Sequence, residues 1–196
     1  MIRMADNNDF REQAAQLRQK SMALGTALGV YYIVKFCLFP MSLQSGTLWG
    51  MLFIVLTLLV PFVVWRMVRR YQQASMPEGM PFVVAWTFAL RIFFFASLLV
   101  AVAHYVYFAF IDGGALAQAY TDSLATLRDT PVEGIGDPLT WQNQLDTLAQ
   151  TIQAIAALTP IQLVMELFVN NLFWGSIAAL FIALFTMRRP APNSKS

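Results

Sequence analysis

Four long runs of apolar residues dominate the pattern of hydrophobic and polar positions along the chain. They cover approximately residues 22–43, 48–65, 82–107 and 161–187. Each run holds about 18 or more largely apolar residues, enough for an α-helix rising about 1.5 Å per residue to cross a hydrocarbon core about 30 Å thick. The pattern predicts an all-α polytopic membrane protein with four transmembrane helices, which form a single integral membrane domain over residues 1–196.

The segments between the runs differ in length and character. Residues 44–47 predict a tight turn. Residues 66–81 predict a connection that ends in the sequence MPEGMP, where Pro77, Gly79 and Pro81 stop one helix and set up the next. The polar tail predicts a separate, weakly amphipathic helix over Asp9–Lys20, with Asn8 or Asp9 as its N-cap. Only residues 112–159 make up a sizeable segment outside the spans.

Apolar residues recur at helical spacing within residues 112–159, on both sides of the turn-rich stretch TPVEGIGDP. They are Leu116, Tyr120, Leu124 and Leu127 before it, and Trp141, Leu145, Leu148, Ile152 and Ile155 after it. We therefore expect an external helical hairpin between the third and fourth spans. Its apolar stripes can pair with each other, rest on the bundle or dock a partner protein.

The composition supports a membrane protein and the distribution of charge gives its orientation. Hydrophobic residues make up 58% of the chain and charged residues only 12%, about half of the roughly 25% found in soluble domains. The net charge of +2 is too small to indicate nucleic-acid binding. Lys and Arg residues are concentrated in the N-terminal tail, the second connection and the C-terminal tail, whereas the external hairpin contains only Arg128. This bias predicts that both termini are cytoplasmic and that the hairpin is external.

Two opposite charges lie inside the spans at similar predicted depth. Lys35 lies eight residues before Leu43 and Glu166 six residues after Pro160, so both fall in the outer half of the bilayer. Gln162, Glu166 and Asn170 recur every four residues and share one helical face. We expect this polar cluster to point into the bundle, where Lys35 and Glu166 form a structural ion pair, or line a polar cavity that binds a charged group. A third alternative is that Lys35 snorkels to the surface.

Other polar residues give weaker indications. Arg91 lies toward the cytoplasmic end of the third span, where it can snorkel onto a lipid phosphate or recognise a phosphorylated headgroup. His104 is the only histidine, and without a second ligand it predicts no metal site. Cys37 is the only cysteine, which excludes an intrachain disulfide.

Small residues at four-residue spacing predict close helix packing. In the first span they are Ser21, Gly25 and Gly29, and in the fourth they are Gly175, Ala179 and Ala183. We expect these two faces to contact each other.

Two segments resemble a family of small bacterial membrane proteins catalogued only as domain of unknown function four-one-nine-nine. They are GMPFVVAWTFALRIFFFASLLVAVAHYVYFAFID and ELFVNNLFWGSIAALFIALFTMRR, and the shared positions are Tyr105, Tyr107, Ile111, Asp112, Asn171, Gly175, Arg188 and Arg189. The resemblance implies a four-span protein of the inner membrane of Gram-negative bacteria and supplies no catalytic residues. Members of the family are often encoded beside a glycosyltransferase that acts on polyprenyl phosphate, which suggests a partner.

The sequence contains no nucleotide-binding glycine loop, nucleophile elbow or zinc-binding histidine pair. We therefore expect a non-catalytic protein without cofactor or metal, which contacts membrane lipids and either a membrane protein partner or copies of itself. Its expected role is that of an accessory or scaffold partner of a membrane enzyme, such as a polyprenyl-phosphate glycosyltransferase. The alternative is a small oligomeric transporter or channel that uses Lys35, Arg91 and Glu166.

Overall fold

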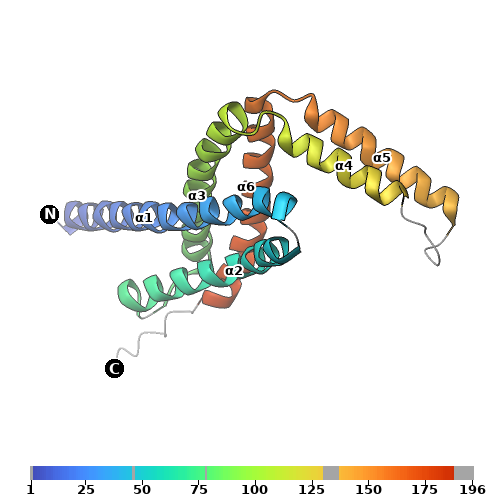
Figure 1. Ribbon diagram of the computed structural model, residues 1–196. Helices are drawn as coiled ribbons and strands as arrows, with labels where there is room; N and C mark the ends of the chain where they lie inside the picture. The colour runs from blue at the N-terminus through green and yellow to red at the C-terminus, as the bar shows by residue number, and fades with distance from the viewer. Residues whose placement is uncertain (1, 46, 78, 130–136, 188–196) are drawn as a thin grey trace.

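The computed structural model describes residues 2–45, 47–77, 79–129 and 137–187 (Figure 1). The predicted loop at residues 130–136 and the C-terminal Arg188 and Arg189 lie outside this part of the chain. The described residues form six α-helices and no strand, which confirms the all-α prediction. These helices are α1 (Ile2–Ser45), α2 (Thr47–Ser75), α3 (Phe82–Phe110), α4 (Ala115–Asp129), α5 (Pro138–Ala156) and α6 (Pro160–Thr186).

Four of these helices are long and apolar enough to cross a membrane, as the sequence predicts. The candidate spans are Ala14–Ser42 of α1, Leu48–Ser75 of α2, Phe82–Phe110 of α3 and Pro160–Thr186 of α6. Spans of 27 to 29 residues exceed the length needed for a perpendicular crossing, so the helices can tilt within the bilayer.

The predicted break after the N-terminal tail is wrong, and α2 runs past the predicted end of its span, because nothing breaks either helix at these junctions. The tail and the first span form one continuous helix from Ile2 to Ser45, without a separate helix or an N-cap at Asn8 or Asp9. Helix α2 continues past Trp65 to Ser75, so that Arg66, Arg69 and Arg70 are helical, and it ends before Pro77 as predicted. Neither junction contains Gly or Pro, whereas Pro77 and Gly79 follow the observed end of α2.

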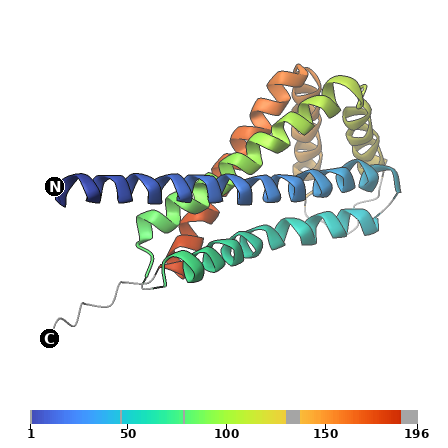
Figure 2. The same cartoon turned by 90° about the vertical axis from the view of Figure 1, so that its left-hand side faces the viewer.

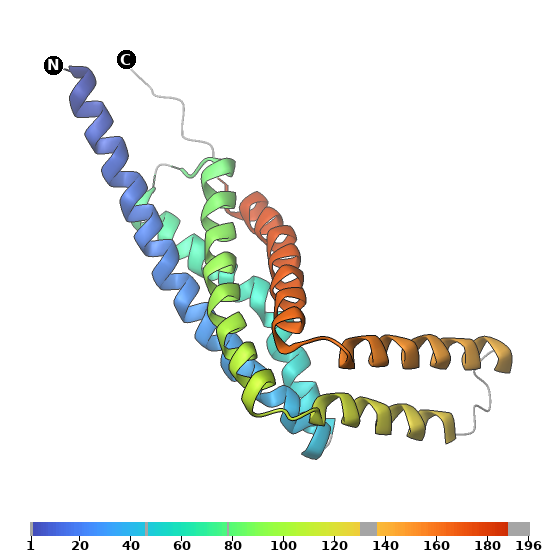
Figure 3. The same cartoon turned by 90° about the horizontal axis from the view of Figure 1, so that it is seen from above.

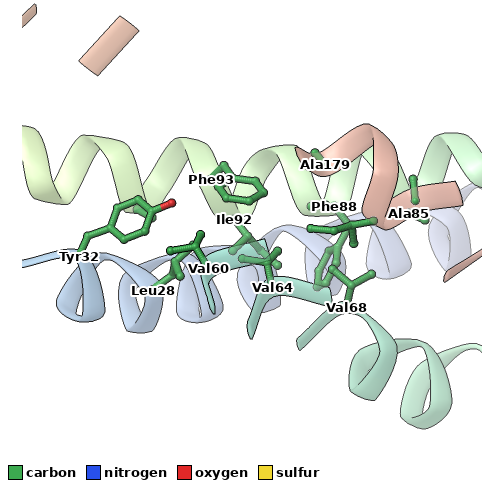
Figure 4. Close-up of a cluster of buried hydrophobic side chains, with 14 of the residues drawn as sticks. Leu28, Tyr32, Val60, Val64, Val68, Ala85, Phe88, Ile92, Phe93 and Ala179 are labelled. Carbon is green, nitrogen blue, oxygen red and sulfur yellow. The ribbon is translucent and has the colours of Figure 1, made fainter. Parts of the chain in front are cut away.

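Helix α3 is the centre of the bundle, because it packs against both α1 and α6 along much of its length. Helix α2 runs beside α1 and also contacts α6 (Figure 2). The core between these helices is apolar: Leu28 of α1, Val64 of α2, and Phe88 and Ile92 of α3 are completely buried (Figure 4). The outward faces of the spans carry many exposed large apolar residues, as expected for helices surrounded by lipid.

The small residues allow close packing, but not between the two faces that the sequence suggested. A Cβ atom on Gly25 would lie 2.6 Å from Cβ of Phe95, and one on Gly175 would lie 2.9 Å from Cβ of Phe93. Both contacts are with α3, and Ala179 of α6 is also completely buried. The expected direct contact between the stripes is wrong, because α3 lies between α1 and α6 (Figure 3).

Helices α4 and α5 form a hairpin that we call the arm, and it projects to one side of the bundle (Figure 3). Leu124, Leu145 and Ile152 are buried between the two helices, and Nη2 of Arg128 lies 2.5 Å from Oδ1 of Asp146. The arm leaves the bundle where α3 ends and α6 begins, and we call this the arm end. The predicted helical hairpin is therefore present.

Local capping fixes the root of the arm. Gly113 and Gly114 have φ values of +55° and +87°, a backbone conformation that glycine adopts readily. The carboxylate of Asp112 accepts hydrogen bonds from the backbone N–H groups of Gly114 and Leu116. At the start of α6, Thr159 and Gln162 form a capping box, which satisfies backbone groups that the helix leaves unpaired.

Candidate functional site

A cavity of about 290 Å³ lies inside the bundle near the arm end. Five helices supply its polar and aromatic lining: Tyr32 and Lys35 come from α1, Phe53 from α2, His104 from α3, Tyr120 from α4 and Asn171 from α6. The remaining walls are apolar. We call this space the Lys35 cavity. Among the described residues that line the cavity, Lys35 alone carries a positive charge. The cavity is therefore suited to an anionic group.

Lys35 is half-buried and is held between aromatic rings. Its Nζ atom lies 4.9 Å from the ring centroid of Tyr32 and 5.2 Å from that of Phe53. Within the described part of the chain, Lys35 forms no ion pair, since the single salt bridge there joins Arg128 and Asp146. Cation–π contacts recover about 0.5–2 kcal/mol, whereas a lysine at the centre of a span costs about 2.5–3.5 kcal/mol. The ammonium group is only partly compensated.

His104 is a second polar group of the cavity, and the sequence alone gave it no role. Its side chain is 7% exposed, and its Nδ1 atom is buried without a hydrogen-bond partner among the described residues. The ring of Phe36 packs edge-on against it at 4.3 Å between centroids. Buried polar atoms are usually hydrogen-bonded, so this imidazole is free to pair with a bound group. The sequence contains one signal for this site, because His104 is the only histidine and lies within an apolar run.

A second cavity, of about 440 Å³, adjoins the first at the root of the arm. The two share lining residues, including Tyr120, Ile155 and Leu163. Leu148 and Ile152 of α5 give the second cavity a largely apolar wall. Partial burial raises the pKa of the Tyr120 hydroxyl, so this group stays protonated at neutral pH and can donate a hydrogen bond. Together, the cavities form one space with a charged inner part around Lys35 and a largely apolar outer part.

The structure does not bring the predicted polar cluster to Lys35. Gln162, Glu166 and Asn170 are exposed on the outer surface of α6, and Glu166 forms no ion pair with a described residue. The expected inward face is therefore wrong. Leu163, Leu167 and Asn171 line the cavity instead. The two stripes differ by one residue, which corresponds to a rotation of about 100° around the helix axis.

Arg91 also lies apart from the Lys35 cavity. Its side chain is exposed on α3, nine residues after the helix begins at Phe82. Contact between Arg91 and a lipid phosphate stays a prediction. Among the described residues, no group of three His, Cys, Asp or Glu side chains is placed to hold a metal ion.

These features define an integral membrane protein with four spanning helices, an arm at one end and an internal cavity around a partly compensated lysine. A family model described as "Protein of unknown function (DUF4199)" matches residues 23–188, and the chain belongs to this family. The match includes most of the first span, the whole of the other three and the arm. The comparisons with curated proteins and with solved structures found no match.

Proposed function

We propose that the protein is a non-catalytic partner of a membrane enzyme, and that it binds this enzyme through the face of α6 that carries Gln162, Glu166 and Asn170. The observation that carries the proposal is the exposure of Glu166 on a membrane-spanning helix, without a basic partner among the described residues. Glu166 lies six residues after Pro160, about 9 Å along the helix from its first residue.

An exposed polar stripe on a spanning helix favours contact with another protein. Ionisable groups within spans are costly, and they almost always face protein or a water-filled cavity instead of lipid. Glutamine and asparagine in the same stripe can donate hydrogen bonds across a helix–helix interface, where such contacts contribute about 0.6–2 kcal/mol each. A basic or amide side chain of a neighbouring helix would therefore complete the surroundings of Glu166.

The arm offers a second contact surface. It buries Leu124, Leu145 and Ile152, but Leu127 and Leu148 remain 42% and 43% exposed. A two-helix unit buries little apolar area by itself, and a protein lying against the arm would cover more of it. The arm and the α6 stripe adjoin at Pro160, so that one partner can contact both.

Charge and the family resemblance support the proposed orientation and the proposed partner. Positive charges around the N-terminus and along the end of α2 favour a cytoplasmic location for the end of the bundle opposite the arm. The arm is then external to a bacterial inner membrane. The proposed partner is an enzyme that handles lipid-linked sugars, such as a polyprenyl-phosphate glycosyltransferase.

Co-purification from native membranes tests this proposal. We expect the wild-type chain to retain a stoichiometric enzyme, and Glu166→Leu to lose it while membrane insertion and melting temperature are maintained. The control is Leu58→Ala, since Leu58 of α2 is 72% exposed and carries no polar group. Retention of the partner by Glu166→Leu at the wild-type yield would show that the α6 stripe is not the interface.

A homo-oligomer is the main competing outcome. The native thiol Cys37 is exposed, so it is first replaced by alanine, and Glu166→Cys is then oxidised in the membrane. A disulfide-linked dimer at high yield, without a co-purifying enzyme, would favour self-association through α6 and contradict the proposed role. A pathway that uses Lys35, Arg91 and Glu166 together is not proposed, because these three side chains lie on different surfaces.

A further inference from the structure

We propose that the Lys35 cavity binds the carboxylate of a single-chain amphiphile, such as a fatty acid, and that its apolar chain extends through the adjoining cavity toward the root of the arm. This inference concerns a different surface from the α6 stripe and does not depend on the protein having a partner.

The charge of the cavity argues for a ligand with one negative charge. Lys35 lacks an ion-pair partner among the described residues, and the rings of Tyr32 and Phe53 compensate its charge only in part. A single carboxylate would neutralise this cation inside the bundle. A phosphomonoester dianion would leave one negative charge unpaired in an apolar environment, which is strongly unfavourable.

Hydrogen-bonding groups are available for the oxygens of a carboxylate. His104 is more than nine-tenths buried, lines the cavity and has an unpartnered ring nitrogen. Asn171 also lines the cavity, and its side-chain amide has two N–H donors. With Lys35 and the Tyr120 hydroxyl, these groups surround the space from four helices. Hydrogen bonds to an ionised acceptor are roughly twice as strong as neutral ones.

The shape of the two cavities argues for a single apolar chain. The charged cavity measures about 290 Å³ and the neighbouring, largely apolar one about 440 Å³. Small-ligand sites typically measure roughly 300–1,000 Å³, so the second cavity lies within this range and the first at its lower limit. Ile155 lines both and marks the connection between them. Asp112 also lines the second cavity. Both of its carboxylate oxygens accept hydrogen bonds from backbone N–H groups of the turn, those of Gly114 and Leu116.

The experiment measures binding of dodecanoate to the purified full-length chain in a neutral detergent, by ligand-induced change in melting temperature. Dodecanol has the same chain length without the charge, and dodecyl phosphate replaces the carboxylate with a group that can carry two charges. We expect dodecanoate to raise the melting temperature more than either of these ligands. Equal stabilisation by dodecanol, or greater stabilisation by dodecyl phosphate, would overturn the assignment of a carboxylate site.

Variants locate the site within the chain. Lys35→Met keeps the length of the side chain and removes its charge, and we expect it to weaken dodecanoate binding roughly tenfold or more. Lys20→Met is the matched control, since Lys20 is exposed on the same helix. Asn171→Leu provides a second variant of the cavity that removes the amide donor. Unchanged affinity in both cavity variants would refute the proposal.

The position of the chain has a separate test. Ile155→Trp adds volume where the two cavities meet, so it should weaken binding of dodecanoate but not that of hexanoate. Equal weakening for both ligands would place the chain elsewhere. Because every measurement uses the purified protein alone, failure here leaves the co-purification result of the α6 stripe unaffected.

Discussion

Gly25→Ala is expected to destabilise the bundle, because the added methyl group meets atoms that cannot move aside. An ideal Cβ at this position would lie 2.6 Å from Cβ of Phe95 and 3.0 Å from the carbonyl oxygen of Ile92. Non-bonded carbon atoms attract each other best at about 3.5–4.0 Å. The carbonyl oxygen of Ile92 belongs to the backbone of α3, and Cβ of Phe95 is attached directly to that backbone. Neither atom can move by a side-chain rotation, so the axes of α1 and α3 must separate.

The magnitude follows from two opposing effects. Overpacking of a close contact costs about 1–3 kcal/mol, whereas alanine is favoured over glycine in a helix by about 1 kcal/mol. Because the backbone of α3 is involved, the upper part of the first range applies, and the net loss of stability is about 1–2 kcal/mol. For a chain of 196 residues, this corresponds to a fall in melting temperature of about 2–8 °C.

Gly50→Ala is the matched control, because a Cβ there meets only Cβ of Ser42, at 3.7 Å. This variant should keep the melting temperature or raise it through helix propensity. Both chains are heated in the same detergent, and the folded fraction is followed by size-exclusion chromatography. If Gly25→Ala and Gly50→Ala raise the melting temperature equally, the close approach of α1 and α3 is wrong.

Two further predictions concern the arm and the orientation of the chain. Leu145 is 6% exposed in the small core of the arm, so Leu145→Ala should lower the stability of the arm by about 2–5 kcal/mol. It should also accelerate amide hydrogen exchange in α4 and α5. Leu139→Ala is the control and should change neither, since Leu139 is 69% exposed. Exchange that is equally fast in both variants would contradict the packing of the arm. A topology reporter at Ser75 should behave as cytoplasmic and one at Gly134 as external, and a cytoplasmic result at Gly134 would reverse the proposed orientation.

The sequence by itself determined the class of protein and the number of spans. Both follow from the length of the apolar runs, because a helix in lipid must satisfy its own backbone hydrogen bonds and present apolar side chains over the full thickness of the bilayer. The arm was also predictable, since its apolar residues recur at helical spacing on both sides of a turn-rich stretch. These properties are local and depend little on neighbouring helices.

Helix ends were less predictable, because a span and its continuation share one conformation. Charge marks where a helix leaves the hydrocarbon core, but it does not end the helix, and α2 therefore continues over Arg66 and Arg69 to Ser75. In the same way, α1 includes both the polar tail and the first span as one continuous helix. The residues that end a helix are those that cannot adopt its backbone, such as Pro77 and Gly79 after α2.

Only the tertiary structure decided which face of each helix points inward. A spanning helix is apolar nearly all round, so its sequence has a weak preference for one rotation about its axis. Packing of Gly175 against Phe93 of α3 fixes the rotation of α6, which directs Asn171 toward Lys35 and leaves Glu166 outside. Packing of α1 against α3 places His104, a residue without a local motif, in the same cavity as the partly compensated lysine, because sites between helices depend on contacts that sequence spacing within one helix does not contain.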